Sequence, residues 1–190
     1  MDNGSIRAGW LSLRAFTVAD VGWVFEVSQD PALQQFVQLP SPYLMEHARF
    51  FVECLAIEKV ASGERAEFLA EDAETGERLG RVGLGMNANA SAEVGYWVAP
   101  GARGRGVAPS AVRAVCRWAF AERQLELIEW RAEVGNEASR RVAQKVGFLM
   151  EGQLRRRLVH RGERVDAWIG SLLKDELEAG SEQSRSSAGH

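Results

Sequence analysis

The chain has 190 residues, of which 46% are hydrophobic and 26% are charged, and its formal net charge is −3. This length is typical of one domain and is sufficient to bury a core without metal or disulfide crosslinks. The composition excludes collagen-like, disulfide-rich and wholly disordered proteins, and no stretch is long and apolar enough to predict a membrane-spanning helix. The acidic balance also disfavours a protein that binds nucleic acid through overall positive charge.

The cysteines and the chain ends give the first expectations about organisation. Cys54 and Cys116 are expected to be reduced thiols in a cytoplasmic protein, because two isolated cysteines make neither a disulfide framework nor a metal site. Residues 1–8 are expected to be a flexible N-terminus. Residues 178–190 hold no large apolar side chain and are expected to be a disordered tail. Residues 9–177 would then form a single domain.

Apolar residues in the first half of the chain follow period-two patterns typical of strands and 3.6-residue patterns typical of helices. In chain order they predict a strand, helical segments and three further strands, at residues 10–16, 18–28, near 31, 45–62, 66–72, 78–86 and 93–98. Turn-forming residues between the strands indicate that the last three are consecutive and antiparallel.

The second half predicts two helices and three strands. They lie at residues 108–123, 125–134, 136–146, from 147, and 165–173. The resulting order is β-αα-βββ-α-β-α-ββ, which predicts an α+β fold, a mixed sheet with helices on both faces. The strand–helix–strand unit at 94–134 predicts a parallel pair with a right-handed crossover.

The strongest local signal is the segment Arg103-Gly104-Arg105-Gly106-Val107-Ala108, which follows a predicted strand and opens a predicted helix. Backbone N–H groups point outward at the positive end of a helix, and glycine removes side chains that would block a phosphate. The segment therefore predicts an anion-binding loop, with a flexible surface loop as the alternative. It is neither a P-loop nor a dinucleotide-binding fingerprint, because the residues that complete those motifs are absent.

Three ordered segments carry a resemblance to a known family. They are Ala92–Val98, the signature Arg103-x-x-Gly106-x-Ala108, and Asn136–Phe148 with its Asn-x-x-Ser and Lys-x-Gly-Phe pattern. Together they resemble the GCN5-related N-acetyltransferase (GNAT) superfamily, and the third resembles the branch that acetylates ribosomal-protein N-termini. The resemblance covers about residues 9–177. It implies a GNAT-like fold in which a splayed pair of parallel strands binds acetyl-CoA.

The resemblance also implies where acetyl-CoA would bind. The pyrophosphate would be bound by the backbone and charge of Arg103, Gly104, Arg105, Gly106, Val107 and Ala108. The pantetheine would contact Val98, where the family's fourth strand leaves the fifth, and Asn136. Ser139 and Lys145 complete the implied cofactor-binding set. A simple helix cap is the alternative interpretation of Asn136.

Glu93 and Ser139 are the candidate catalytic residues. An amine is largely protonated at neutral pH, so its acetylation benefits from a base, and Glu93 matches a fourth-strand Glu of some family members. Many family members use a Tyr on the last helix to give a proton to the departing thiolate, but Ala143 stands at that position here. Ser139 matches a Ser that the ribosomal branch is proposed to use instead. An exposed carboxylate and a helix-start Ser are the alternatives. Leu158 stands where that branch has an acidic residue, which leaves the exact substrate open.

The resemblance thus implies an enzyme that moves the acetyl group of acetyl-CoA directly to a primary amine, on a protein N-terminus or a small molecule, without a metal. Cys54 and Cys116 lie outside the three segments, so no covalent cysteine intermediate is expected. One alternative is a catalytically weak acyl-CoA-binding sensor on the same fold. A second is a nucleic-acid-binding module using the basic segment 155–164, which the overall charge disfavours. A homodimeric state is left open.

Overall fold

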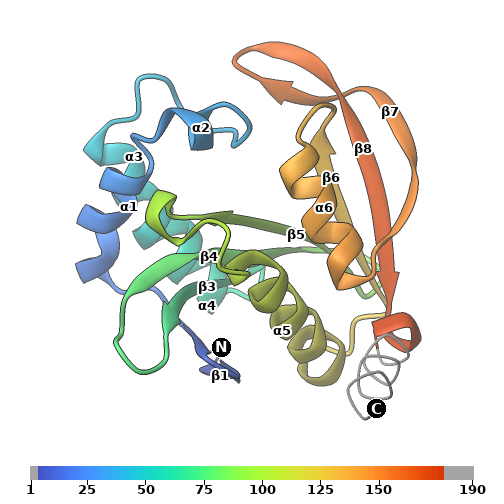
Figure 1. Cartoon of the computed structure of the whole chain (residues 1–190), viewed down its shortest axis with the longest axis horizontal. Coiled ribbons are helices and arrows are strands. Elements are labelled where there is room, and N and C mark those ends of the chain that lie inside the picture. Colours follow the sequence, from blue (N-terminus) through green and yellow to red (C-terminus); the bar gives the residue numbers. More distant parts are fainter. Residues whose placement is uncertain (1–3, 178–190) are drawn as a thin grey trace.

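A single twisted sheet of eight strands organises the protein (Figure 1). The computed structural model describes residues 4–177, and the predicted tail at 178–190 lies outside them. In the order β1-β2-β3-β4-β5-β6-β8-β7 across the sheet, the strands are β1 (Ile6–Ala8), β2 (Leu11–Arg14), β3 (Arg65–Asp72), β4 (Arg78–Asn87), β5 (Ser91–Val98), β6 (Leu127–Glu133), β8 (Glu163–Leu173) and β7 (Leu149–His160).

One pair of neighbouring strands is parallel. β5 and β6 run in the same direction, while β3, β4 and β5 are mutually antiparallel, which confirms the predicted mixed sheet. The pairing of β5 with β6 begins at Ser91–Leu127 and stops at Val94–Trp130, although β5 continues to Val98 and β6 to Glu133. The two strands therefore separate toward their C-terminal ends, and this part of β5 has backbone groups that β6 does not use.

Helices cover both faces of the sheet (Figure 1). In chain order they are η1 (Val18–Asp20), α1 (Val21–Val27), α2 (Pro31–Gln34), α3 (Met45–Phe50), the π-helical segment η2 (Phe51–Glu58), α4 (Lys59–Ala61), η3 (Pro100–Ala102), α5 (Val107–Glu122) and α6 (Glu137–Val146). The helix predicted at 45–62 is thus divided by a π-helical segment. The helices predicted at 108–123 and 136–146 are found within one residue of their expected ends.

Two hydrophobic cores lie on opposite faces of the sheet. Phe68 and Ala70 of β3 belong to the core that contains the buried side of α5, whereas Leu69 belongs to the smaller core with residues of α1 and α3. Successive side chains of a strand point to opposite faces, so one strand supplies both cores. On β5 the same alternation places Ala92 and Val94 in the α5 core and turns Glu93 to the other face.

The N-terminal end of the sheet differs from the expectation. Residues 6–8 form β1, which pairs with β2 from Ile6–Leu13 to Ala8–Leu11, so they are part of the sheet and not of a flexible N-terminus. Main-chain hydrogen bonds to β2 hold β1 in the sheet. Three residues are too few to show the alternation of apolar and polar side chains that predicts a strand.

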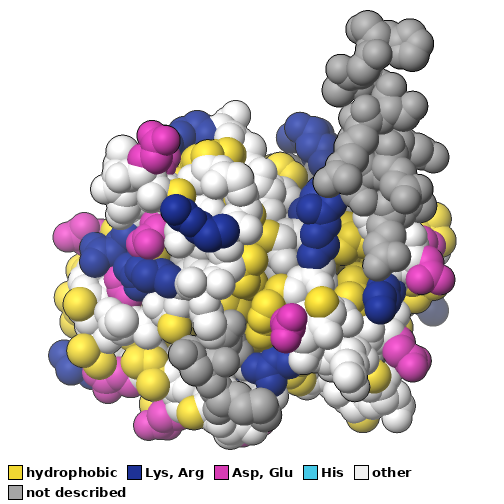
Figure 2. All heavy atoms as spheres, turned by 90° about the horizontal axis from the view of Figure 1, so that it is seen from below, with side chains coloured by type: hydrophobic (Ala, Val, Ile, Leu, Met, Phe, Trp, Pro, Cys, Tyr) yellow, Lys and Arg dark blue, Asp and Glu magenta, His cyan; other side chains and the backbone are white. Residues whose placement is uncertain are grey.

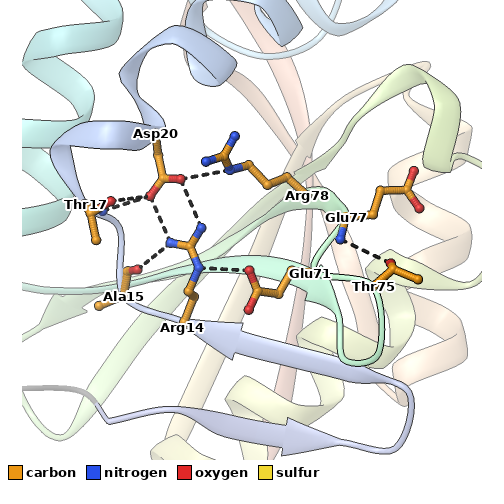
Figure 3. Close-up of polar contacts among 8 residues, drawn as sticks. All are labelled: Arg14, Ala15, Thr17, Asp20, Glu71, Thr75, Glu77 and Arg78. Carbon is orange, nitrogen blue, oxygen red and sulfur yellow. Dashed lines mark hydrogen bonds and ion pairs between the residues drawn. The ribbon is translucent and has the colours of Figure 1, made fainter.

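A buried ion-pair network joins β2 to the start of α1 (Figure 3). Asp20 is fully buried, and its carboxylate accepts hydrogen bonds from Arg14 at 2.9 and 3.0 Å and lies 3.0 Å from Nε of Arg78. The backbone N–H of Thr17 donates a further bond at 2.9 Å. Burial alone raises the pKa of Asp20, but the bonds from Arg14 and Thr17 outweigh it, so the pKa is lowered. The carboxylate is therefore charged and fixes the β2–α1 connection.

We expect Asp20→Ala to lower the free energy of unfolding by about 3 kcal/mol, the low end for breaking a buried pair, because Arg14 and Arg78 are partly exposed and can hydrate. An acid with a lowered pKa stabilises the fold above its unfolded-state pKa, and this contribution is lost as the pH falls through its folded-state pKa. The difference between wild type and variant should therefore shrink in acid. Urea denaturation measures it. Glu53→Ala, which breaks the exposed pair with Arg49, is the control, and an equal loss in both variants would contradict the account.

Candidate active site

A cavity of about 700 Å³ lies where β5 and β6 separate, between the region of α2 and the starts of α5 and α6. Its lining includes every predicted cofactor-binding residue except Arg105, namely Val98, Arg103, Gly104, Gly106, Val107, Ala108, Asn136, Ser139 and Lys145. Glu93 and Arg105 are not among the lining residues. The fold thus brings residues of the loop at 103–108 and of the start of α6 to the lining of one cavity.

The loop that opens α5 presents its backbone to this cavity. Gly104 and Gly106 have φ angles of +77° and +79°, a conformation that favours glycine. A Cβ atom at either position would meet no other atom within 4 Å, so the space beside the loop is open. The N–H groups in the first turn of α5 have no partner within the helix, and the helix dipole makes this end positive. The loop can therefore receive the oxygens of a phosphate.

The two arginine side chains of the loop already have carboxylate partners. Arg103 ion-pairs with Asp30, and its guanidinium is the main reason that the pKa of Asp30 is lowered. Arg105 lies 3.0 Å from Glu77, with its guanidinium 5.9 Å from the ring centre of Trp10. Anion binding would therefore rest first on backbone N–H groups, and Arg103 is the arginine of this loop that lines the cavity.

Side chains from three elements meet at Ser139. The Asn136 side chain accepts a hydrogen bond from the Ser139 N–H at 3.1 Å, so it caps α6 as the alternative interpretation expects. The Ser139 hydroxyl accepts a bond from Nε1 of Trp130 at 3.0 Å and lies 2.9 Å from the hydroxyl of Tyr96. Burial raises the pKa of Tyr96 to about 12, so this hydroxyl keeps its proton at neutral pH.

Tyr96 is the site residue that the sequence analysis did not single out. The resemblance places a Tyr on the last helix, but Ala143 stands at that position and is buried. Tyr96 reaches Ser139 instead from β5, and both residues line the cavity. The alternation along β5 could have identified Tyr96. Ala92 and Val94 lie on the same side of the strand and belong to the core that contains buried residues of α5 and α6.

Glu93 lies on the other face of the sheet, in the paired part of β5. Its carboxylate is 3.2 Å from Arg131, and Arg131 also bonds Glu129 at 2.9 Å. Burial raises the pKa of Glu93, and the charge of Arg131 opposes the rise only in part. The structure therefore places Glu93 on the face of the sheet opposite to Ala92 and Val94, and Glu93 is not among the residues that line the cavity.

Metal and thiol chemistry can be assessed within residues 4–177. No group of three or more His, Cys, Asp or Glu side chains is arranged there to hold a metal ion. Cys54 and Cys116 are both free, and burial raises the pKa of Cys116 to about 12, which leaves it a protonated, unreactive thiol. None of the helices in this part of the chain has the length and apolarity to cross a membrane.

A parallel strand pair that splits beside a glycine-containing helix start is the arrangement that the resemblance to the GNAT superfamily implies. The Acetyltransferase (GNAT) domain model matches residues 11–149, and the chain belongs to this family. Over 90 residues it is 42% identical to YdaF of Bacillus subtilis, which is named as a ribosomal N-acetyltransferase. That match covers 47% of this chain and 49% of YdaF, so it spans about half the length of this relative.

Two longer comparisons cover almost the whole domain. The chain is 27% identical over 168 residues to an uncharacterised N-acetyltransferase of Bacillus licheniformis, covering 87% of this chain and 94% of that protein. Among solved structures, Mycobacterium smegmatis RimJ in complex with CoA-disulfide is similar with a TM-score of 0.83 and 25% identity, covering 97% and 93% of the two chains.

Proposed function

We propose that this protein transfers the acetyl group of acetyl-CoA directly to a primary amine, on a protein N-terminus or a small molecule. The observation that carries the proposal is the cavity at the split between β5 and β6, which is lined both by the loop at 103–108 and by Asn136 and Ser139. The similarity to YdaF, with its ribosomal acetyltransferase name, and to RimJ bound to a CoA disulfide supports it. The two free cysteines support a cytoplasmic location.

The residues of the cavity suit the parts of acetyl-CoA. Backbone N–H groups between Gly104 and Ala108 would bind the pyrophosphate, and Gly104 and Gly106 leave the space it needs. The end of β5 near Val98 lies beyond its pairing with β6 and would bond the pantetheine, and Asn136 and Lys145 also line the cavity. Acetyl-CoA supplies an activated acetyl thioester, so the protein has to bind, orient and move protons.

Glu93 is the proposed base that takes a proton from the acceptor amine. Its burial raises its pKa, which makes it a stronger proton acceptor than an exposed carboxylate. Glu93 does not line the cavity, so the proton would reach it through a water molecule.

Ser139 is the proposed proton donor to the departing thiolate. Its hydroxyl lines the cavity and lies 2.9 Å from the Tyr96 hydroxyl, which stays protonated at neutral pH because its pKa is about 12. A proton that leaves Ser139 can therefore be replaced from Tyr96, and Tyr96 would regain its proton from solvent in the cavity, which it lines.

We expect Ser139→Ala to lower turnover by about tenfold, less than the usual worth of an acid catalyst, because a thiol with a pKa near 8.5 leaves readily without a proton. The affinity for CoA should barely change, and high pH should not restore the rate. Tyr96→Phe, which keeps the buried ring and removes the hydroxyl, should resemble Ser139→Ala. Steady-state rates and calorimetry measure both quantities. Turnover equal to wild type in both variants would contradict proton transfer through Ser139 and Tyr96.

The alternative of a catalytically weak acyl-CoA sensor is separated from the enzyme by an acceptor panel. The panel contains a peptide with a free N-terminus, a free amino acid, a polyamine and an aminoglycoside, each mixed with acetyl-CoA while thiol release is followed. We expect one class of amine to accelerate release. Tight CoA binding without release in the presence of any amine would favour the sensor.

The basic segment at 155–164 lends little support to nucleic-acid binding. The carboxylate of Asp166 accepts bonds from the Arg156 N–H at 2.8 Å and from Gln153 at 2.9 Å, so an acid lies within the hairpin. On the face seen in Figure 2, Lys and Arg side chains are interspersed with Asp and Glu and do not form one continuous basic surface. An amine acceptor is therefore favoured over a nucleic acid as the partner.

A further inference from the structure

An ion pair joins the loop that opens α5 to the short helix α2. The guanidinium of Arg103 donates a hydrogen bond to Oδ2 of Asp30, which lies 73 residues earlier in the chain. Asp30 is the N-cap residue of α2, and the same oxygen accepts a bond from the backbone N–H of Leu33 at 2.8 Å. The Asp30 side chain is 16% exposed and the Arg103 side chain 41%. The acid is therefore fixed by α2, and the arginine is the partner that can move.

Both members of the pair are charged at neutral pH. The hydrogen bond from Arg103 is the main reason that the pKa of Asp30 is lowered, and burial opposes this shift only in part. An arginine keeps its proton throughout the physiological range. Asp30 therefore holds a full negative charge in contact with the loop that is proposed to bind the pyrophosphate of acetyl-CoA.

The two segments that the pair joins line the same cavity. Arg103 lines it together with Gly104 and Gly106 of its own loop. Residues 32, 33 and 35–37, which belong to α2 and the segment after it, line it as well, but Asp30 is not among the lining residues. A ligand in the cavity would therefore meet Arg103, whereas the acid that holds the guanidinium of Arg103 lies outside the lining.

A phosphate in the cavity would compete with Asp30 for Arg103. A guanidinium binds phosphate through the same N–H groups with which it binds a carboxylate, and both contacts are charge-assisted hydrogen bonds. Arg103 directly precedes Gly104, where the backbone N–H groups proposed to bind the pyrophosphate begin. Its long side chain can therefore turn from Asp30 to a phosphate bound at this loop, and the ion pair with Asp30 has to break when it does.

The second arginine of the loop provides an internal comparison. Arg105 lies 3.0 Å from Glu77, so it is also paired with a carboxylate. Neither Arg105 nor Glu77 is among the residues that line the cavity. A phosphate in the cavity would not draw Arg105 away from its partner. Of the two pairs, only the one between Arg103 and Asp30 should respond to the cofactor.

We propose that Asp30 is a positioning residue that holds the guanidinium of Arg103 away from the cofactor and releases it when CoA or acetyl-CoA binds. The inference rests on the proposed binding of acetyl-CoA at this loop and names the residue that sets the affinity. Because the ion pair has to break, CoA binds less tightly than it would to a free Arg103. The product CoA carries the same pyrophosphate as acetyl-CoA, so the pair also favours release of the product.

A double-mutant cycle separates this competition from simple charge repulsion. Asp30→Asn removes the charge and keeps the N-cap of α2, since Asn and Asp cap helices about equally well. Arg103→Gln removes the guanidinium, and the two substitutions are also combined. Glu77→Gln is the matched control, because it removes the same charge from the partner of Arg105. Calorimetry at one ionic strength measures CoA affinity, and the melting temperature checks that each variant is folded.

We expect Asp30→Asn to tighten CoA binding about three- to fivefold when Arg103 is present, the upper part of the range for a partly exposed ion pair. In the Arg103→Gln protein the same substitution should have a clearly smaller effect, because no guanidinium remains to be released. Glu77→Gln should leave CoA affinity unchanged.

Three results would overturn the inference in a protein that binds CoA. A gain that is equal or larger in the Arg103→Gln protein would show repulsion between the carboxylate and the phosphates without competition. Unchanged or weaker binding in folded Asp30→Asn would show that the ion pair does not oppose the cofactor. An equal gain in Glu77→Gln would show a general effect of charge. These results would leave the proposed function standing, whereas a wild-type protein that binds no CoA would contradict both.

Discussion

Gly106→Asp is expected to abolish CoA binding while the protein stays folded. Gly106 has a φ of +79° at the start of α5, and a side chain there would enter the open space of the cavity. A carboxylate about 4 Å from a pyrophosphate charge would cost about 4 kcal/mol at an effective dielectric constant near 20. Since about 1.4 kcal/mol corresponds to a tenfold change, affinity should fall roughly 10³-fold.

Gly106→Asn is the matched control for this substitution. Asn has nearly the same size as Asp and tolerates a positive φ equally well, so it imposes the same backbone strain without the charge. Calorimetric titration with CoA should therefore find a much smaller loss for Asn than for Asp, and thermal melting should find the two variants equally folded. Unchanged CoA affinity in a folded Gly106→Asp protein would show that the pyrophosphate does not bind at this loop.

Glu93→Gln should lower turnover by about 10²- to 10⁴-fold near neutral pH, the usual worth of a general base. A base has to be deprotonated, and the pKa of Glu93 is raised, so the wild-type rate should fall as the pH drops through a value above that of an ordinary carboxylate. The variant lacks this group. Its rate should instead rise with pH as the acceptor amine loses its proton unaided, and high pH should recover much of the loss.

Glu129→Gln is the control for the charge change at Glu93. Glu129 is paired with the same Arg131, at 2.9 Å, and lies directly opposite Glu93 on β6. Both substitutions remove one negative charge from the same cluster, but only Glu93 is the proposed base. A Glu93→Gln enzyme with wild-type turnover and pH profile, or an equal loss in Glu129→Gln, would refute the assignment.

The sequence predicts well those elements in which the periodic pattern of apolar residues continues over many residues. The 16 residues of α5 bury one side, including Val112, Val115 and Ala119, and this pattern is visible without coordinates. β1 has three residues and is ordered by its hydrogen bonds to β2, which no side-chain pattern reveals. The π-helical segment was also not predicted, because its apolar residues continue the spacing of the helix before it.

The candidate site likewise has parts that the sequence predicts and parts that it does not. The loop at 103–108 and the start of α6 are continuous segments, so a motif could identify them, and the fold brings both to one cavity. Tyr96 and Ser139 are 43 residues apart, and Asp30 and Arg103 are 73 apart. Their pairing depends on strand register and on the place of α2 beside the loop. As isolated residues in the sequence they carry no signal for such contacts.

The account is tested most directly by mass spectrometry after incubation with isotopically labelled acetyl-CoA and the acceptor panel. We expect the labelled acetyl group on the nitrogen of an amine, with one CoA thiol released for each amine modified and no label on the protein. Label on the protein would contradict direct transfer. Tight CoA binding with no labelled amine would contradict the assignment as an acetyltransferase and leave an acyl-CoA-binding protein.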